Sequence, residues 1–318
     1  MVTTAVATSQ QPGIDTSNQI FAQDDKFWDN YSRGRPQVPD NFWDRIWAFH
    51  ESKGGVFNTV HDVGAGNGPY AQRLRSRFAN VIVSDIVADN IRLAQDRLRG
   101  QSGFAFRTAA LEDADDIPAG SIDMVFAANV MHFAEPQHDA MATIARQLRS
   151  GGTFVAALFG PARFRNAKVQ DLWERLSYQG GRELLRVSED PDQVVKVMAR
   201  TQDRYNVAPL DRALFGDEVR IHVNMEHGGI QGMLPPEFAH RNQEPDYGAG
   251  DHESHEVMEG WTFETDLQGV TEHFGSFPFI SRFPDALADL FQELNELLAG
   301  GKTVEGYFPV AIILATRK

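Results

Sequence analysis

The chain has 318 residues, of which 42% are hydrophobic and 23% charged, so it can bury a sizeable core without disulfides or metals. It contains no cysteine, which excludes disulfides, zinc–thiolate sites, iron–sulfur clusters and cysteine nucleophiles. The 44 acidic residues against 30 basic ones give a net charge of −14, which disfavours binding to nucleic acid and to anionic membranes.

The first 24 residues carry no targeting pattern. They have neither the basic start and apolar run of a secretory signal nor the arginine-rich amphipathic pattern of a transit peptide. We therefore expect a disordered tail over 1–24 and a cytoplasmic protein. Nowhere does the sequence approach the run of about 18 apolar residues that a transmembrane helix requires, so no membrane partner is expected.

From residue 59 onward, short apolar runs alternate with amphipathic helices. Strands are expected at 59–63, 81–84, 104–107, 122–127 and 153–159. Helices are expected at 70–78, 87–98 and 139–148, each between two of these strands. Strands and helices that alternate at this spacing predict a doubly wound α/β fold with a mostly parallel sheet.

The alternation stops after residue 160. The elements expected next are polar helices over 161–205, a strand at 219–225, a Gly-, Pro- and acid-rich stretch over 226–256, a helix at 286–298 and a strand at 306–316. Pro309 cannot donate a backbone hydrogen bond, so it should lie near the start of the last strand or at a bulge.

These patterns divide the chain into a Rossmann-like domain and an insertion. We expect 25–160 and 261–318 to form the domain and 161–260 to form a mostly helical insertion on the substrate side. An insertion after the fifth strand lies over the carboxyl ends of the strands, where such sheets bind ligands.

A glycine-rich loop follows the first predicted strand and opens a helix, with the sequence Asp62-Val63-Gly64-Ala65-Gly66-Asn67-Gly68. A dinucleotide site would have its third small residue where this chain has Pro69, so the loop fits that class poorly. The loop resembles motif I of class I S-adenosylmethionine-dependent methyltransferases. This resemblance implies contacts to the cofactor from Asp62, Gly64, Ala65, Gly66, Asn67 and Gly68, and a sheet whose last strand is antiparallel.

Two acidic positions follow in register with the loop. Asp85 ends the next predicted strand, where a carboxylate either accepts from the ribose hydroxyls of a nucleoside or caps the following helix. The stretch from Asp113 to Pro118 (DADDIP), followed by SIDMV, resembles the D-A-E-x-L-P…S-F-D-x-V pattern of the same family. The resemblance implies that Asp113 and the backbone of Ala114 bind adenine, and that Ile86 packs on its face.

The segment from Phe27 to Pro36 (FWDNYSRGRP) resembles the Y-x-x-x-R-P-x-x-P entry of the trans-aconitate methyltransferase-like group, which includes many fungal small-molecule methyltransferases. In that group this segment covers the cofactor, which implies that Tyr31 and Arg35 approach its methionine end. A guanidinium can pair with the methionine carboxylate through two hydrogen bonds. The alternative is an ordinary amphipathic lid.

The stretch from Ala128 to Phe133 (ANVMHF) resembles the group's A-x-x-x-H-W pattern, with Phe133 in place of Trp. The resemblance implies that Asn129 lies near the methionine moiety and His132 near the substrate opening. It covers 27–160 well, the last strand weakly, and thins out across 161–260.

Methyl transfer from a sulfonium needs a base only when the acceptor carries a proton at the working pH. His132 is the best candidate for that base, and its alternative role is to shape the pocket. His222 and His227 are weaker candidates. The run from Asp251 to Glu256 (DHESHE) contains H-x-x-H, but a solvated acidic loop fits it better, so no metal is expected.

The patterns favour an enzyme that moves the methyl group of S-adenosyl-L-methionine to an O, N or C nucleophile of a small molecule of natural-product or organic-acid type, leaving S-adenosyl-L-homocysteine. The alternative is a non-methylating cyclase or pericyclase that binds the same cofactor. A partner-binding module would not need the intact loop, Asp85 and Asp113. The expected partner is a small-molecule acceptor and not nucleic acid, with the protein a monomer or homodimer.

Overall fold

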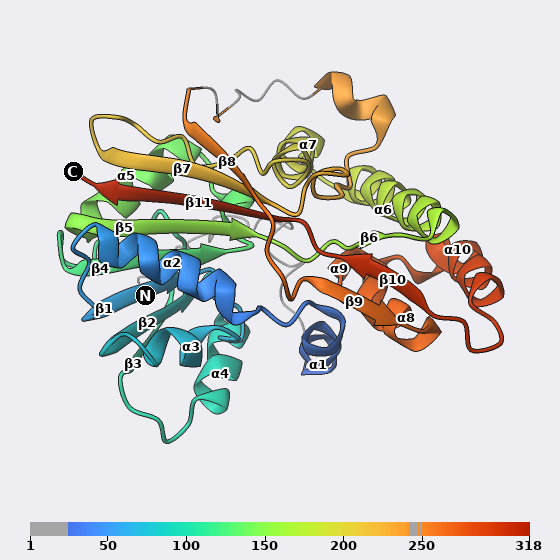
Figure 1. Cartoon of the computed structure of the whole chain (residues 1–318), viewed down its shortest axis with the longest axis horizontal. Coiled ribbons are helices and arrows are strands. Elements are labelled where there is room, and N and C mark those ends of the chain that lie inside the picture. The colour runs from blue at the N-terminus through green and yellow to red at the C-terminus, as the bar shows by residue number, and fades with distance from the viewer. Residues whose placement is uncertain (1–24, 242–246, 249) are drawn as a thin grey trace, which may run out of the picture.

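The computed structural model describes residues 25–241, 247–248 and 250–318, so the predicted tail over 1–24 lies outside the described residues. The main element is an eight-stranded sheet in the order β3-β2-β1-β4-β5-β11-β7-β8 (Figure 1). Its strands are β1 (Thr59–Val63), β2 (Asn80–Asp85), β3 (Phe104–Thr108), β4 (Ile122–Ala128), β5 (Leu148–Leu158), β7 (Phe215–Val223), β8 (His252–Glu256) and β11 (Val310–Arg317). The last strand, β11, is antiparallel to both neighbours and all other pairs are parallel, which confirms the predicted fold class.

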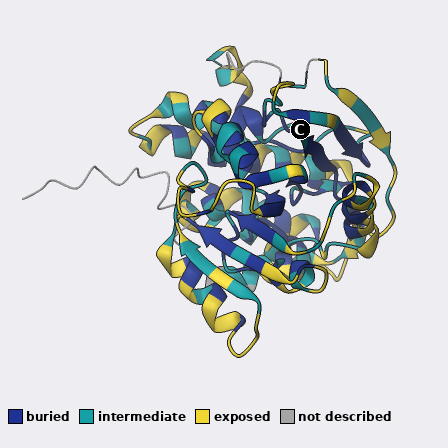
Figure 2. Ribbon diagram, turned by 90° about the vertical axis from the view of Figure 1, so that its left-hand side faces the viewer, coloured by how far each residue is buried: buried dark blue, intermediate teal, exposed yellow. Residues whose placement is uncertain are grey.

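The central strands are buried on both faces because they are continuous apolar runs. Every residue of β4 is buried, as are the last seven residues of β5. One face is covered by α2 (Asp40–Ser52), α3 (Ala71–Arg75) and α4 (Ala88–Arg97), and the other by α5 (Gln137–Gln147). Figure 2 shows the buried strands between helices whose outer faces are exposed. The result is a three-layer sandwich whose strand ends are left for a site.

A second lobe faces the carboxyl ends of β4 and β5 (Figure 1). It consists of a three-stranded sheet, β6-β10-β9, with α6, α8, α9 and α10. The bounds are β6 (Arg163–Phe164), β9 (Thr262–Thr265), β10 (Val304–Tyr307), α6 (Ala167–Val187), α8 (Leu267–Gly275), α9 (Pro278–Arg282) and α10 (Pro284–Leu297). Three further elements, α7 (Pro191–Arg200) and the 3-10 helices η2 (Met131–Phe133) and η3 (Pro236–Arg241), complete this side.

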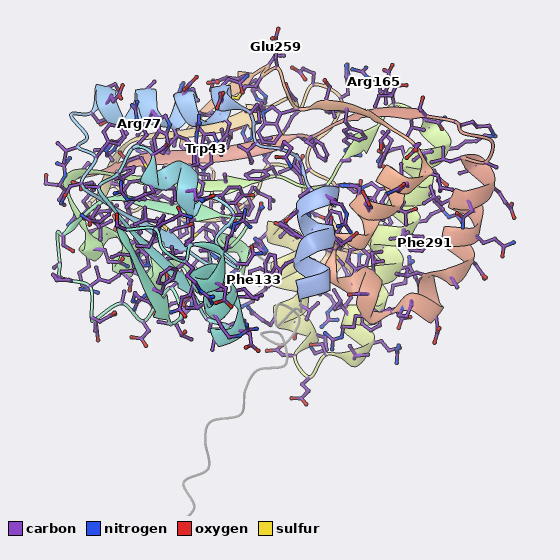
Figure 3. All side chains as sticks on the ribbon, turned by 90° about the horizontal axis from the view of Figure 1, so that it is seen from below. Trp43, Arg77, Phe133, Arg165, Glu259 and Phe291 are labelled. Atoms are coloured by element: carbon purple, nitrogen blue, oxygen red, sulfur yellow. The ribbon has the colours of Figure 1, made fainter. Side chains whose placement is uncertain are left out.

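The first helix, α1 (Asp25–Gly34), lies between the sheet and the second lobe (Figure 3). Its Asn30 side chain donates to the backbone oxygen of Glu272 at 3.3 Å, so it packs against α8. No helix in the described part of the chain has the length and hydropathy needed to span a membrane.

The structure divides the chain differently from the predicted boundaries. The segment 161–260 contributes β7 and β8 to the main sheet, whereas 261–303 belongs mostly to the second lobe. The predicted strand over 306–316 is two strands, β10 and β11, which belong to different sheets. Pro309 lies between them, directly before β11, because it cannot donate to a strand ladder.

Three buried histidines keep their imidazoles neutral. Burial lowers the pKa of His61 to about 4, and its two ring nitrogens lie 2.7 Å from Gln147 Oε1 and 2.7 Å from Ser84 Oγ. Burial likewise lowers the pKa of His132 and of His273 to about 3. In the unfolded chain these groups take up protons near the ordinary value of 6.5.

We therefore expect the protein to be sensitive to mild acid. Between about pH 6.5 and pH 4 the unfolded chain binds more protons than the folded one, so the free energy of unfolding falls as the pH falls, by about 1.4 kcal/mol per pH unit for each histidine. Urea unfolding at pH values across this window measures the slope. A free energy that stays constant there would mean that these imidazoles are charged in the folded protein.

Candidate functional site

The glycine loop connects β1 to α3 at the carboxyl edge of the sheet. The N–H of Ala65 donates to Ser84 O and the N–H of Gly68 donates to Ala65 O, both at 2.9 Å. Asn67 lies within this turn and is half-buried. The loop is thus folded back beside the end of β2, next to Asp85.

Glycines are required in the loop because two side chains approach its backbone closely. A Cβ on Gly64 would lie 2.2 Å from Cγ2 of Val130, and a Cβ on Gly66 would lie 2.7 Å from the ring of Trp28. Gly66 also has a φ of +56°, in the left-handed region. The loop is therefore held between the segment after β4 and helix α1.

Asp85 contacts the start of α4 and also holds the loop. Its Oδ1 accepts from Val87 N at 2.9 Å and from Asn90 Nδ2 at 3.2 Å, while its Oδ2 accepts from Gly66 N at 2.8 Å. Burial raises the pKa of this carboxyl. Oδ2 keeps a lone pair for a further donor. The adjacent Ile86 is 48% exposed, an unusual fraction for an isoleucine beside a buried carboxylate.

The structure brings the second acidic stretch next to Asp85. The N–H of Ala109, at the start of this loop, donates to Asp85 O at 3.1 Å. Asp113 is exposed and its backbone oxygen accepts from Arg107 Nη2 at 2.7 Å, while Ala114 is buried. Ile86, Asp113 and Ala114 thus lie around one end of the edge, and their contacts to adenine stay predictions.

Two charged groups at the other end lack partners of opposite charge. Asp62 is buried and its Oδ2 accepts no hydrogen bond. Burial, followed by the charge of Asp85, raises its pKa well above the ordinary value. Arg35 makes no ion pair within the described residues, and its buried Nε has no hydrogen-bond partner. Burial lowers the pKa of this guanidinium.

Arg35 is fixed by rings and by a carbonyl. Its guanidinium carbon lies 3.9 Å from the centroid of Phe277 and 4.8 Å from that of Tyr31, and its Nη2 donates to Ser276 O at 3.3 Å. Tyr70 lies at the same place. Its phenol has a pKa raised well above the ordinary value by burial and by Tyr31 and Asp62, while Arg35 lowers it. Arg35 and Asp62, neither with a partner of opposite charge, thus lie near the phenols of Tyr31 and Tyr70, and of these four side chains only that of Asp62 is fully buried.

Arg35 also touches the end of β5. Gly160 has a φ of +136°, and a Cβ there would lie 2.0 Å from Arg35 Nη1. Substituting Gly160→Ala should therefore displace the guanidinium. If Arg35 pairs with the methionine carboxylate of the cofactor, as the resemblance implies, the binding of S-adenosylhomocysteine should weaken about 10-fold in a calorimetric titration. Gly54→Ala is the matched control, because Gly54 has a φ of +72° but nothing within 4 Å of its Cβ. Equal affinities for the two variants would mean that Arg35 does not bind the cofactor.

Asn129 and His132 follow β4, and the side chain of each contacts another part of the chain. Asn129 Oδ1 accepts from Phe159 N at 3.0 Å, which joins the ends of β4 and β5. His132 is buried, and its Nδ1 lies 3.5 Å from Tyr205 Oη. Burial and the nearby Arg200 lower its pKa to about 3, which makes it a weak base.

The other two candidate histidines lie apart. His222 is buried on β7, its Nε2 is 3.1 Å from Glu253 Oε2 and its Nδ1 has no partner. Burial lowers its pKa. His227 is exposed on the turn after β7. The run predicted as a solvated loop is strand β8, in which His252 and His255 point to opposite faces. No three His, Cys, Asp or Glu side chains in the described ranges are arranged to hold a metal ion.

The comparisons with known proteins agree with this geometry. Residues 61–156 match the family described as "Methyltransferase domain". Methyltransferase gedG of Aspergillus terreus is 52% identical over 99% of this chain and 98% of its own length. Methyltransferase tpcM of Aspergillus fumigatus is 52% identical over 96% of each chain. The chain belongs to the S-adenosylmethionine-dependent methyltransferases.

This methyltransferase is an enzyme whose cofactor is S-adenosyl-L-methionine. A solved structure, a putative type II methyltransferase from Anaeromyxobacter dehalogenans, is 20% identical and covers 88% of this chain and 97% of its own, with a TM-score of 0.53. That likeness shows the shared fold. It extends beyond the matched segment 61–156 into the second lobe.

Sequence reasoning missed three residues that contact the candidate site residues of this methyltransferase, namely Trp28, Tyr70 and Gly160. A glycine directly after a buried strand often marks a close approach of backbone and side chain, so Gly160 carried a usable signal. Tyr70 follows the glycine loop by two residues. Trp28 lies within the segment that pointed to Tyr31 and Arg35, but nothing in the sequence indicates that its ring reaches Gly66.

Proposed function

We propose that the enzyme transfers the methyl group to a nucleophile of a small-molecule acceptor of natural-product or organic-acid type. The relatives at 52% identity are both named methyltransferases and match nearly the whole chain, second lobe included. The second lobe faces the carboxyl edge of the sheet and would hinder the approach of a macromolecule more than that of a small acceptor.

The observation that carries the cofactor site is the pair of unsatisfied charges. A guanidinium and a fully buried carboxyl group that lack partners of opposite charge are costly unless a ligand supplies the opposite charges. The methionine end of the cofactor has one carboxylate and one ammonium group. We assign the carboxylate to Arg35, beside Tyr31, and the ammonium to Asp62.

The adenosine end would lie along the same edge. The free lone pair of Asp85 Oδ2 suits a ribose hydroxyl, and the exposed side chain of Ile86 suits an adenine face. Asp113 and Ala114 would bind the adenine edge. The glycine loop would lie beside the ribose, since the N–H of Gly66 already donates to Asp85 Oδ2.

When bound, the cofactor would supply an electrophilic methyl group on a sulfonium: an in-line nucleophile of the acceptor would bond to the methyl carbon as the carbon–sulfur bond breaks, and neutral S-adenosylhomocysteine would leave. The residues of the chain supply alignment and exclude water. His132 and His222 are uncharged weak bases, because burial lowers both pKa values. This favours an acceptor whose nucleophile is already ionised at neutral pH, as in an organic acid.

The test uses the purified protein with cofactor labelled in its methyl group and two pools of acceptors, one of aromatic carboxylic acids and one of phenols. We expect label in the acid pool. Label in the phenol pool alone would refute the acid preference. Consumption of an acceptor without label transfer would favour a cyclase, and a protein that binds neither S-adenosylmethionine nor S-adenosylhomocysteine would refute the function.

A further inference from the structure

Gly34 and Arg35 are contacted by three residues at the carboxyl-terminal end of α8 and just beyond it, His273, Ser276 and Phe277. We call these three residues the seat. A Cβ on Gly34 would lie 2.1 Å from Glu272 O, so the two backbones are in close contact. Ser276 O accepts from Arg35 and the ring of Phe277 stacks on its guanidinium. A residue of the second lobe can therefore fix the position of a cofactor-binding side chain.

His273, at the centre of this seat, bridges two backbone segments. It is buried, its Nδ1 lies 2.8 Å from Gly34 O, and Ala162 N donates to its Nε2 at 3.3 Å. A carbonyl oxygen only accepts and an N–H only donates, so these partners assign the proton to Nδ1 and the lone pair to Nε2. The pKa of about 3, lowered by burial, keeps this neutral form.

The two bridged residues flank the contact between Arg35 and Gly160. Gly34 directly precedes Arg35, and Ala162 follows Gly160 by two positions. Gly34 O belongs to the last turn of α1, whose carbonyls have no partner within the helix. The imidazole provides that partner and connects it to the segment after β5. Ser276 Oγ in turn donates to His273 O at 2.6 Å. This bond links the histidine to Ser276, whose backbone oxygen accepts from Arg35.

We propose that His273 is a positioning residue that holds the Arg35 guanidinium against Gly160, ready for the carboxylate of the cofactor. The proposal rests on the cofactor site proposed above. A purely structural role is the competing explanation, because His273 packs among aromatic side chains of the second lobe, with ring centroids 5.6 Å from Trp173 and 5.4 Å from Phe277.

Two ligands separate the explanations. S-adenosylhomocysteine has the amino-acid end that Arg35 would bind, and 5′-methylthioadenosine lacks it. His273→Asn keeps a donor near the position of Nδ1, whereas His273→Gln keeps an acceptor near Nε2. We expect His273→Gln to lose affinity for S-adenosylhomocysteine about 10-fold, His273→Asn to lose less, and both to bind methylthioadenosine within about 2-fold of the unaltered protein.

His50→Asn is the matched control. His50 is a buried bridging imidazole, 2.7 Å from Thr153 Oγ1 and 3.0 Å from Val56 O, at the opposite edge of the sheet. The His50→Asn variant should have a lower melting temperature, but its affinity for S-adenosylhomocysteine should fall no more than its affinity for methylthioadenosine. In an Arg35→Met background, His273→Gln should cause no further loss of affinity.

Equal losses for both ligands, or additive losses in the double variant, would overturn the proposal. An imidazole 15N spectrum of the unaltered protein provides a measurement that needs no variant, and a proton on Nε2 of His273 would also overturn it. The failure of the unaltered protein to bind S-adenosylhomocysteine would instead refute the proposed function, so the two failures are distinguishable.

Discussion

Arg35→Met is expected to weaken the binding of S-adenosylhomocysteine about 100-fold or more, because it removes the only charge proposed to pair with the cofactor carboxylate. The melting temperature should stay the same or rise. Arg35 is a desolvated cation that makes no ion pair within the described residues, and replacing such a charge by an apolar side chain of similar size relieves its desolvation. A variant that loses its ligand but not its stability is typical of a binding residue.

The control is Arg33→Met. Arg33 lies on the same helix, but its side chain is 58% exposed and pairs with Glu272 at 3.2 Å. The Arg33→Met variant should bind S-adenosylhomocysteine with an affinity within about 2-fold of that of the unaltered protein, since an exposed ion pair contributes little to the stability of the fold. An Arg35→Met protein that binds as tightly as the control would place the carboxylate elsewhere.

Asp85→Ala is expected to have a comparably large effect, about 100-fold or more, because two ribose hydroxyls and the loop would lose their common acceptor. The variant also frees the N–H of Gly66, which accounts for part of the loss. Asp85→Asn separates the two contributions. It retains an oxygen for one donor and should bind more tightly than Asp85→Ala. Calorimetry with S-adenosylhomocysteine and with adenosine measures both.

Asp89→Ala is the control for this pair, since Asp89 lies in the first turn of the same helix with its side chain 73% exposed. It should bind both ligands normally. If Asp85→Ala retained normal affinity for adenosine, the carboxylate would serve only to hold the loop and the start of α4, through Gly66, Val87 and Asn90.

The cofactor half of the fold was predictable because its central strands are largely buried apolar runs. The predicted strand over 122–127 lies within β4, the predicted strand over 153–159 overlaps β5 and ends one residue beyond it, and the predicted strand over 59–63 coincides with β1. Continuous apolar runs between turn residues indicate such strands without knowledge of their neighbours.

The pairing of strands in the second half was not predictable. The segment His252–Glu256 is polar throughout, yet it pairs with β7 at the edge of the main sheet, where a strand buries little surface. The break at Pro309 sends β10 and β11 to different sheets although they are adjacent in the sequence. Such choices depend on tertiary partners, which local periodicity does not encode.

The candidate site likewise has one part that the sequence predicts and one part that depends on tertiary contacts. The glycine loop and Asp85 are close in sequence to the strands that carry them, and the structure joins them through Gly66. The seat of Arg35 comes from His273, Ser276 and Phe277, more than two hundred positions away along the chain. One consequence is that the proposed cofactor site draws residues from the sheet and from the second lobe, so cofactor binding would hold the two together.

A crystal structure of the complex with S-adenosylhomocysteine tests the central claim most directly. The account predicts the ligand carboxylate within about 3 Å of the Arg35 guanidinium and the ligand ammonium at the same range from Asp62 Oδ2. A complex in which Arg35 contacts only Ser276 O while the carboxylate binds elsewhere would contradict it.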